Sequence, residues 1–324
     1  MTLRAFRVGV VGARRARQGT GAYLALDLHA AGAKVVAVAG TSRTTAATAA
    51  AALAPSGMVA TPYDDVSAMI GAERLDALVI ASPHEAHEAS LGLGLAAGLH
   101  ILCEKPLLVP DEHSIAVGTG LLEAFAARHL LLAVNAQWRH ALGAYMQLFP
   151  DVVPRAATTF EMELSPRTTG LSMIADALPH PLSLLDHLFP VATPGLRDVE
   201  VCFASAHEAT LRFTHPGGAR GVRVVVRLSN GDEDPRPAAF GFDGRLARRE
   251  VSNPGYRLFL RADPGHTARR EGFPYPTDAV ARRFVERVRK GPPFPIDSVT
   301  RAGLVHLYEL VAAAARVAPR GVGG

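Results

Sequence analysis

Two short stretches of the chain carry side chains that can polarise an oxygen atom or move a proton. The first is Glu104-Lys105-Pro106, directly after an apolar run, and the second contains Asp176 and His180, four residues apart. A lysine in a cleft can donate a hydrogen bond to a hydroxyl or carbonyl oxygen, and Glu104 can hold or tune it. In a helical turn Asp176 and His180 share one face, where the carboxylate orients the imidazole and raises its basicity.

Each stretch also has an explanation that involves no ligand. Lys105 is then an ordinary surface lysine, Asp176 caps a helix N-terminus, and His180 only packs. Pro179 and Pro181 flank the histidine, and two prolines argue against a regular helix at this position.

The elements that must position these residues alternate in type over the first part of the chain. Strand-like runs occupy residues 8–11, 34–39, 75–81, 100–103 and 130–134, and helix-like segments occupy 20–31, 44–53, 84–97 and 111–128. The strand-like runs are mostly apolar and do not alternate with polar residues, which is typical of a parallel sheet covered by helices on both faces. Lys105 therefore follows a strand at the carboxyl edge of the sheet, where open α/β sheets bind ligands.

A glycine-rich stretch, residues 12–21 with the sequence GARRARQGTG, joins the first strand-like run to the first helix. A dinucleotide-binding fold has its phosphate loop there, because the amides of a helix N-terminus favour phosphate. The stretch departs from GxGxxG, since Arg14 and Arg17 take the later glycine places if Gly12 is the first. A second interpretation uses Gly19 and Gly21 in an enlarged loop.

Arginine side chains can make bidentate contacts to phosphate, so we expect a modified phosphate loop. A solvated basic turn is the alternative. The residues of this loop that are expected at the cofactor are Gly12, Ala13, Arg14, Arg15 and Arg17.

The second strand-like run is followed by Gly40, Thr41, Ser42 and Arg43. An enzyme that uses NAD usually has an aspartate or glutamate here for the ribose hydroxyls, and this chain has neither. Ser42 and Arg43 suit a 2′-phosphate, so NADP(H) is favoured over NAD(H), with Thr41 beside them. Alternatively, Arg43 only caps the following helix in solvent.

The second half of the chain has a different pattern. Strand-like runs at 156–164, 199–204, 208–214, 221–229, 238–243 and 246–251 are separated by turn signals, with helix-like segments at 172–188, 278–289 and 298–317. This pattern predicts a mostly antiparallel open sheet of five or six strands. The prediction is an α/β chain with a Rossmann dinucleotide-binding domain over residues 1–135. A second α/β domain, for substrate binding and oligomerisation, covers 136–324, and its C-terminal helix can pack back on the first.

Residues 81–108, ASPHEAHEASLGLGLAAGLHILCEKPLL, resemble the Gfo/Idh/MocA family, the glucose–fructose oxidoreductase and inositol dehydrogenase group. The family pattern is roughly Pro-Asn, a histidine a few residues on, Ala-Gly-Lys-His, and then Glu-Lys-Pro. The matching residues are Pro83, His84 in place of the asparagine, His87, Ala97-Gly98, His100 and Glu104-Lys105-Pro106. The resemblance covers nearly the whole chain and implies a cis peptide before Pro106.

The resemblance also implies roles for individual residues. It makes His180 the acid/base, Asp176 the residue that positions it or the substrate, and Lys105 the group that completes the site. Arg139 follows Trp138 where the family has an aromatic–arginine pair, and it contacts cofactor or substrate or ties the domains together. The other residues expected at the cofactor are Ser82, Pro83, His84, His87, Glu104 and Lys105 itself.

The chain departs from the family near His180. The family often has an aspartate three residues after the histidine, whereas this chain has Ser183 there and Asp186 one turn later. These changes leave the acid/base role in place and the substrate open.

These patterns predict an NADP(H)-dependent oxidoreductase. It would move a hydride between nicotinamide C4 and a hydroxyl or carbonyl carbon of a small polar substrate, by resemblance a sugar or sugar derivative. Two alternatives stay open: a cofactor-retaining relative that cleaves glycosides or acts as a lyase, and an NADP-binding sensor without activity. The resemblance further implies a homodimer or homotetramer.

The bulk composition narrows the class of protein. The 324 residues carry 34 Lys and Arg against 30 Asp and Glu, and this small excess without a dense basic block argues against nucleic acid as a partner. Cys103 and Cys202 form no CxxC pair, so neither a zinc site nor a disulfide framework is expected. No apolar run is long enough to span a bilayer and the N-terminus leaves no room for a signal peptide, so we expect a cytoplasmic protein.

Overall fold

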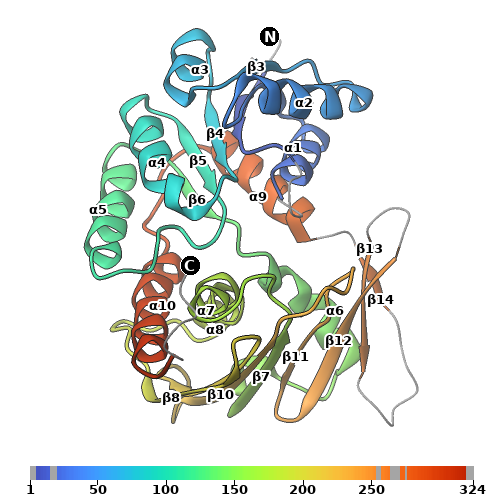
Figure 1. The fold of residues 1–324 in the computed structure, drawn as a ribbon, viewed down its shortest axis with the longest axis vertical. Helices are drawn as coiled ribbons and strands as arrows, with labels where there is room; N and C mark the ends of the chain where they lie inside the picture. The colour runs from blue at the N-terminus through green and yellow to red at the C-terminus, as the bar shows by residue number, and fades with distance from the viewer. Residues whose placement is uncertain (1–4, 15–19, 253–256, 263–270, 274–275, 319–324) are drawn as a thin grey trace. The chain divides into compact units, whose positions relative to one another are not determined.

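The computed structural model describes residues 5–14, 20–252, 257–262, 271–273 and 276–318 (Figure 1). The chain divides into two compact units. The first contains Met1–Val109, Ala116–Asn135 and Thr277–Asp297, and the second contains Pro110–Ile115, Ala136–Pro276 and Ser298–Gly324. The polypeptide therefore passes between the units several times.

The first unit is built on a six-stranded sheet with the order β3-β2-β1-β4-β5-β6, in which all neighbouring strands are parallel. The strands are β1 (Arg7–Val11), β2 (Lys34–Ala39), β3 (Thr61–Tyr63), β4 (Ala77–Ile80), β5 (His100–Cys103) and β6 (Leu132–Val134). This order confirms the predicted Rossmann-type parallel sheet. Strands β2 and β3 lie on one side of β1, and β4, β5 and β6 lie on the other. The order of the strands therefore reverses between β1 and β4, and the loops after these two strands flank the point where such sheets bind ligands.

Helices cover both faces of this sheet (Figure 1). One face carries α1 (Gly21–Ala30), α2 (Arg43–Leu53) and α9 (Pro276–Lys290), which share an apolar core with β1 and β2. The other face carries α3 (Val66–Ala72), α4 (His87–Ala96) and α5 (Ser114–Ala127). Helix α9 comes from the far end of the sequence, yet its Phe284 ring lies 6.3 Å from the ring of Phe6.

The second unit contains an eight-stranded sheet with the order β14-β13-β12-β11-β7-β10-β9-β8. The strands are β7 (Thr159–Leu164), β8 (Arg197–Ser205), β9 (Glu208–His215), β10 (Val222–Ser229), β11 (Ala238–Phe242), β12 (Arg245–Ser252), β13 (Arg257–Ala262) and β14 (Glu271–Phe273). Only the β7–β10 pair is parallel among the described strands, so the mostly antiparallel class is confirmed.

The predicted count of five or six strands was too low. Strands β13 and β14 were missed; β14 spans only three residues, too few to show a periodicity of two.

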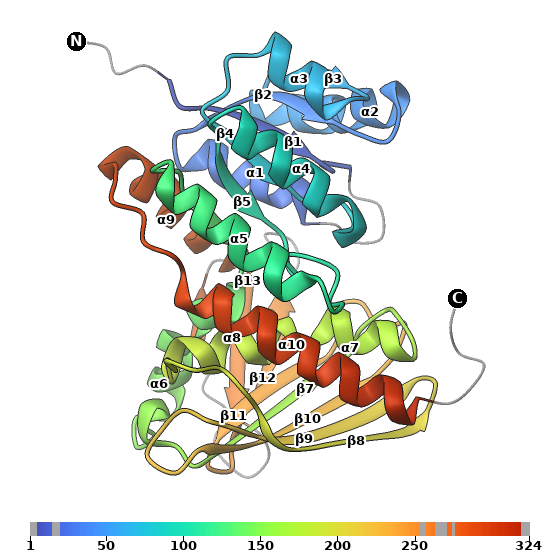
Figure 2. The same cartoon turned by 90° about the vertical axis from the view of Figure 1, so that its left-hand side faces the viewer.

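One face of the second sheet is covered by α7 (Leu171–Ala177), α8 (Pro179–Leu188) and α10 (Ser298–Val317), while α6 (Leu142–Leu148) packs near β13 and β14. Figure 2 shows α10 lying along α7 and α8. The opposite face is open and charged: Arg227 pairs with Glu161 at 2.9 Å and Arg248 with Glu163 at 3.0 Å. Alternation along each strand thus separates an apolar helix-covered face from a polar open face.

Candidate active site

Two glycines shape the loop between β1 and α1. Gly12 has a φ of 80°, and a Cβ on it would lie 2.6 Å from the carbonyl oxygen of Ala81. Gly21 begins α1, and a Cβ there would collide with the carbonyl oxygen of Gly12. These contacts hold the start of α1 against the end of β1, so the helix N-terminus lies at the carboxyl edge of the sheet. Gly12 and Gly21 are therefore the glycines that the fold requires, which favours the enlarged loop.

The remaining loop residues differ in how they are placed. Ala13 is buried and Arg14 is exposed. Arg15 and Arg17 lie outside the described residues, so their contact with phosphate stays a prediction.

We expect Gly12→Ala to destabilise the first unit and to weaken dinucleotide binding. The positive φ alone costs a residue with a Cβ about 1–2 kcal/mol, and the collision with Ala81 adds to this. Differential scanning calorimetry with and without NADPH measures both effects. Gly92→Ala, on the exposed side of α4 with open space around it, is the matched control and should be neutral or slightly stabilising.

The residues after β2 have a structural role that the sequence analysis did not assign. Ser42 is the N-cap of α2: its Oγ accepts from the Thr45 amide at 3.2 Å, and Thr45 Oγ1 accepts from the Ser42 amide at 3.0 Å. The Arg43 guanidinium lies over the Tyr63 ring at 5.8 Å. Ser42, and not Arg43, thus caps the helix, and the exposed Thr41 precedes them at the carboxyl edge of β2.

The loop after β4 is tied to the loop after β5 by a buried histidine. His87, 1% exposed, has Nε2 2.9 Å from the carbonyl oxygen of Ser82 and Nδ1 3.0 Å from that of Pro106. Pro83 precedes the short 3-10 helix η2 (His84–Ala86), where Nε2 of His84 lies 3.4 Å from Oε1 of Glu85. His87 therefore fixes the spacing of two loops at the ligand-binding edge of the sheet.

The carboxylate of Glu104, directly after β5, accepts hydrogen bonds from three donors. Its Oε1 accepts from Asn135 Nδ2 at 2.6 Å and from the Thr20 hydroxyl, and its Oε2 accepts from the Lys105 backbone N–H at 3.3 Å. The peptide bond after Lys105 is cis, as the resemblance implied. Burial, and then the charge of Glu104, raise the pKa of the Cys103 thiol well above its ordinary value. Thr20 and Asn135 were missed because neither belongs to a motif.

Two buried polar atoms at this edge fit a bound dinucleotide. Among the described residues, neither Ser82 Oγ nor Asn135 Oδ1 has a hydrogen-bond partner. A carboxylate only accepts, so the Asn135 NH₂ must face Glu104 and its Oδ1 remains an acceptor. Together with the helix N-terminus beside Gly12, these groups suit a ligand with phosphates, hydroxyls and a carboxamide.

In the second unit, Asp176 lies on α7 and His180 on α8, and the single residue between these helices keeps a right-handed helical backbone. Leu178 joins α7 to α8 with φ −67° and ψ −25°; its amide donates to Ile174 O at 3.0 Å, and its own carbonyl accepts from the Leu182 amide at 3.1 Å. The expected disruption at His180 is therefore wrong. The flanking prolines stand in the first turn of α8, where the amides have no intrahelical acceptor to lose.

His180 also contacts the segment that follows β6. Its ring lies 6.1 Å from the ring of Trp138 in an edge-on arrangement, and both side chains belong to the second unit. Arg139 is the next residue in the 3-10 helix η3 (Gln137–Ala141), with its Nε 3.5 Å from Nε2 of His140. The aromatic–arginine pair of the sequence thus places its aromatic member against the candidate acid/base.

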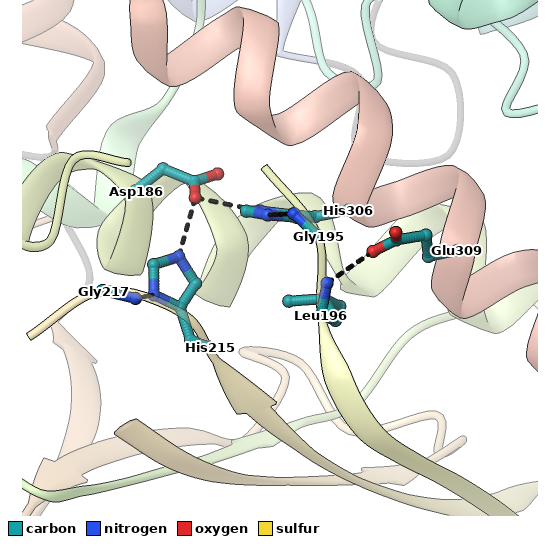
Figure 3. Close-up of polar contacts among 7 residues, drawn as sticks. All are labelled: Asp186, Gly195, Leu196, His215, Gly217, His306 and Glu309. Carbon is teal, nitrogen blue, oxygen red and sulfur yellow. Dashed lines mark hydrogen bonds and ion pairs between the residues drawn. The ribbon is translucent and has the colours of Figure 1, made fainter. Parts of the chain in front are cut away.

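A buried cluster that the sequence analysis did not foresee lies on the same helix as His180 (Figure 3). Oδ1 of Asp186 lies 2.9 Å from Nε2 of His215 and 3.0 Å from Nδ1 of His306, and all three side chains are at most 1% exposed. The cluster links α8 to β9 and α10. Residues 186, 215 and 306 are far apart in the sequence, so no local spacing could have revealed it.

The hydrogen bonds on the outer side of each imidazole show which nitrogen carries the proton (Figure 3). The Gly217 amide donates to Nδ1 of His215 at 3.2 Å, and the Gly195 amide donates to Nε2 of His306 at 3.1 Å. Each neutral ring therefore has its proton on the nitrogen that faces Asp186. A metal ion would need that nitrogen unprotonated and the outer one as a donor, so the cluster suits shared protons and not a metal.

Comparison with known proteins supports a dinucleotide-binding fold for the first unit. Residues 6–136 match the family model described as oxidoreductase family, NAD-binding Rossmann fold. Inositol 2-dehydrogenase from Corynebacterium glutamicum (strain R) is 38% identical over 114 residues, 35% of this chain and 32% of that protein. Inositol 2-dehydrogenase from Leifsonia xyli is 41% identical over 103 residues, 32% of this chain and 26% of that protein. The alignments span about a third or less of these relatives.

Two solved structures resemble almost the whole chain in fold. UDP-N-acetylglucosamine 3-dehydrogenase GnnA from Acidithiobacillus ferrooxidans aligns with a TM-score of 0.66 and 22% identity, covering 96% of this chain and 98% of its own. The 3-ketoreductase KijD10 from Actinomadura kijaniata, with TDP-benzene and NADP, aligns with a TM-score of 0.67 and 19% identity, again over 96% and 98%.

Within the described residues, no helix has the length and apolar character needed to cross a membrane. The match over residues 6–136 confirms the expected class of cofactor, a nicotinamide dinucleotide. Residues 6–136, which contain the parallel six-stranded sheet of the first unit, thus match the NAD-binding Rossmann domain of the Gfo/Idh/MocA oxidoreductase family.

Proposed function

We propose that this protein is a nicotinamide-dependent oxidoreductase that acts on the hydroxyl or carbonyl carbon of a sugar-like substrate. The observation that carries the proposal is the Glu104 network, which holds the backbone of Lys105 beside the start of α1 at the carboxyl edge of the sheet. The dehydrogenases and the ketoreductase that resemble the chain support the substrate class.

Each proposed catalytic residue has one task. The Lys105 ammonium donates a hydrogen bond to the reacting oxygen of the substrate and stabilises negative charge that develops there. An imidazole nitrogen of His180 takes the hydroxyl proton during oxidation and returns it during reduction, while Asp176 orients the ring. The nicotinamide, when bound, supplies the hydride chemistry. The protein contributes the placement of the oxygen and the proton.

We further propose that NADP(H) is preferred to NAD(H), because Ser42 and Arg43 follow β2, where a Rossmann fold usually has a carboxylate for the ribose hydroxyls, and no carboxylate follows β2 directly. Thermal unfolding with NADPH, NADH or neither, at matched concentrations, tests this. A ligand at about 100 times its dissociation constant adds roughly 2.7 kcal/mol, so NADPH should raise the unfolding temperature more than NADH does.

Arg43→Ala should remove most of the difference between the two nucleotides, whereas Arg74→Ala, an exposed arginine elsewhere in the first unit, should keep it. Equal shifts with both nucleotides in the unsubstituted protein would contradict the preference.

We also propose that the protein is a homodimer or homotetramer that associates through the open face of the second sheet. This face carries both signs of charge, with Arg227 and Arg248 beside Glu161 and Glu163, so a second copy could continue the ion pairs. Light scattering coupled to size exclusion measures the state directly. A monomer at micromolar concentration would contradict the proposal.

A further inference from the structure

Arg249 is an arginine on the helix-covered face of the second sheet. On β12 it alternates with Arg248, whose guanidinium pairs with Glu163 on the open face. Arg249 points the opposite way, like the core residue Ala247 two positions earlier, and its Cζ lies 5.8 Å from the centre of the Trp138 ring. A positive charge therefore stands on the face that otherwise packs apolar side chains.

Part of this guanidinium has no acceptor among the described residues. Nη2 of Arg249 donates to the carbonyl oxygen of Arg236, whereas Nε is buried and has no hydrogen-bond partner in that part of the chain. Four other arginines of the same sheet have a carboxylate within 3.0 Å; they are Arg227, Arg245, Arg248 and Arg261. An unused N–H donor on a cation in a largely apolar setting favours an anionic acceptor, which a guanidinium can bind through two parallel hydrogen bonds.

Trp138 brings this charge near the residue to which we assign proton transfer. The same indole that lies under Arg249 lies 6.1 Å from the His180 ring. Arg249 and His180 are both partly exposed, whereas Trp138 is buried. A ligand whose reacting hydroxyl meets His180 can therefore place a second group near the guanidinium of Arg249.

We propose that Arg249 binds an anionic group of the substrate, a carboxylate or a phosphate, so that the substrate is an acidic sugar or a sugar phosphate and not a neutral polyol. This inference rests on the proposed function, because it takes the substrate of His180 as its ligand. Arg249 is then a specificity-determining residue: it selects the charge of the substrate without taking part in proton transfer.

Isothermal titration calorimetry on the full chain saturated with NADP⁺ tests the proposal. The probes are glucose, glucuronate and glucose 1-phosphate, so that the second and third differ from the first by a carboxylate or a phosphate. The unsubstituted protein should bind one of the charged sugars more tightly than glucose. Arg249→Met should weaken that binding about 10- to 100-fold, the usual effect of losing a hydrogen bond between charged groups, and leave glucose and NADP⁺ unaffected.

Arg248→Met is the matched control, because it removes the neighbouring charge on the open face and should keep the preference. Arg249→Lys retains the positive charge but not the planar guanidinium, so it should keep part of the preference for the charged sugar. Binding of NADP⁺ by each variant checks that it is folded. Equal binding of all three sugars by the unsubstituted protein, or a preference that survives in Arg249→Met, overturns the inference.

Turnover separates this inference from the proposed function. If glucose is oxidised as readily as the charged sugars, the oxidoreductase proposal stands and the anionic class fails. If Arg249→Met loses the charged sugars but the unsubstituted protein reduces no NADP⁺ with any of them, the anion site stands and the proposed activity fails.

Discussion

Replacing His180 by asparagine is expected to lower kcat by about 10²- to 10⁴-fold, the contribution typical of a positioned acid/base. Asparagine retains a polar side chain of similar reach at the start of α8, but it cannot accept and release a proton near neutral pH. Because His180 belongs to the second unit, the dissociation constant of NADP(H) should stay within about twofold, which is a small change on this scale.

The measurement is the rate of nicotinamide reduction or oxidation against pH. The unsubstituted protein should show a limb that reports the titration of one group near neutrality, and His180→Asn should lack this limb. His207→Asn is the control, since it removes an exposed histidine from the same unit. If His180→Asn keeps its kcat and its pH limb, the assigned role is wrong and another group must move the proton.

Replacing Asp186 by alanine is expected to cost about 1–3 kcal/mol of the free energy of unfolding of the second unit. The substitution leaves the inward N–H group of His215 without its acceptor, removes the carboxylate that lies 3.0 Å from Nδ1 of His306, and opens a cavity between α8 and α10. Asp186→Asn is the matched variant. It keeps a carbonyl oxygen for both imidazoles, so its loss should be less than half as large.

Denaturant titration followed by tryptophan fluorescence isolates this effect. Trp138 is the only tryptophan of the chain and belongs to the core of the second unit, so its emission reports the unfolding of that unit alone. A loss below about 1 kcal/mol in Asp186→Ala would show that the imidazoles find other acceptors and that the cluster does not hold the helices together.

The sequence predicted an element correctly where the pattern of its residues is compatible with one kind of structure only. The run Lys34–Ala39 is apolar after its first residue, and it forms a parallel strand with these same bounds that is buried from Val35 onward. The strand at Thr61–Tyr63 was missed because it is short and contains Pro62. The helix at His180 was doubted because periodicity rules penalise proline wherever it occurs, whereas the actual cost depends on the position of the proline within the helix.

Contacts between distant residues could not be predicted from one sequence. Glu104 was assigned to the site by its neighbour Lys105, but its partners Thr20 and Asn135 come from other loops that the sheet order brings together. Likewise, the direction in which Arg249 points depends on the register of β12 against β11. Hydrophobic patterns predict which face of an element is buried and say nothing of which other element covers it.

The position of α9 has a consequence for the order in which the protein can mature. Its residues Val280, Phe284 and Val285 complete the core of the first unit, and Thr277 donates to Asp27 of α1 at 2.6 Å. A ribosome releases the last strand of the first sheet long before it makes α9, because the whole second sheet is translated in between. The nascent first unit therefore presents an unfinished apolar face to solvent or to a chaperone until α9 has been made.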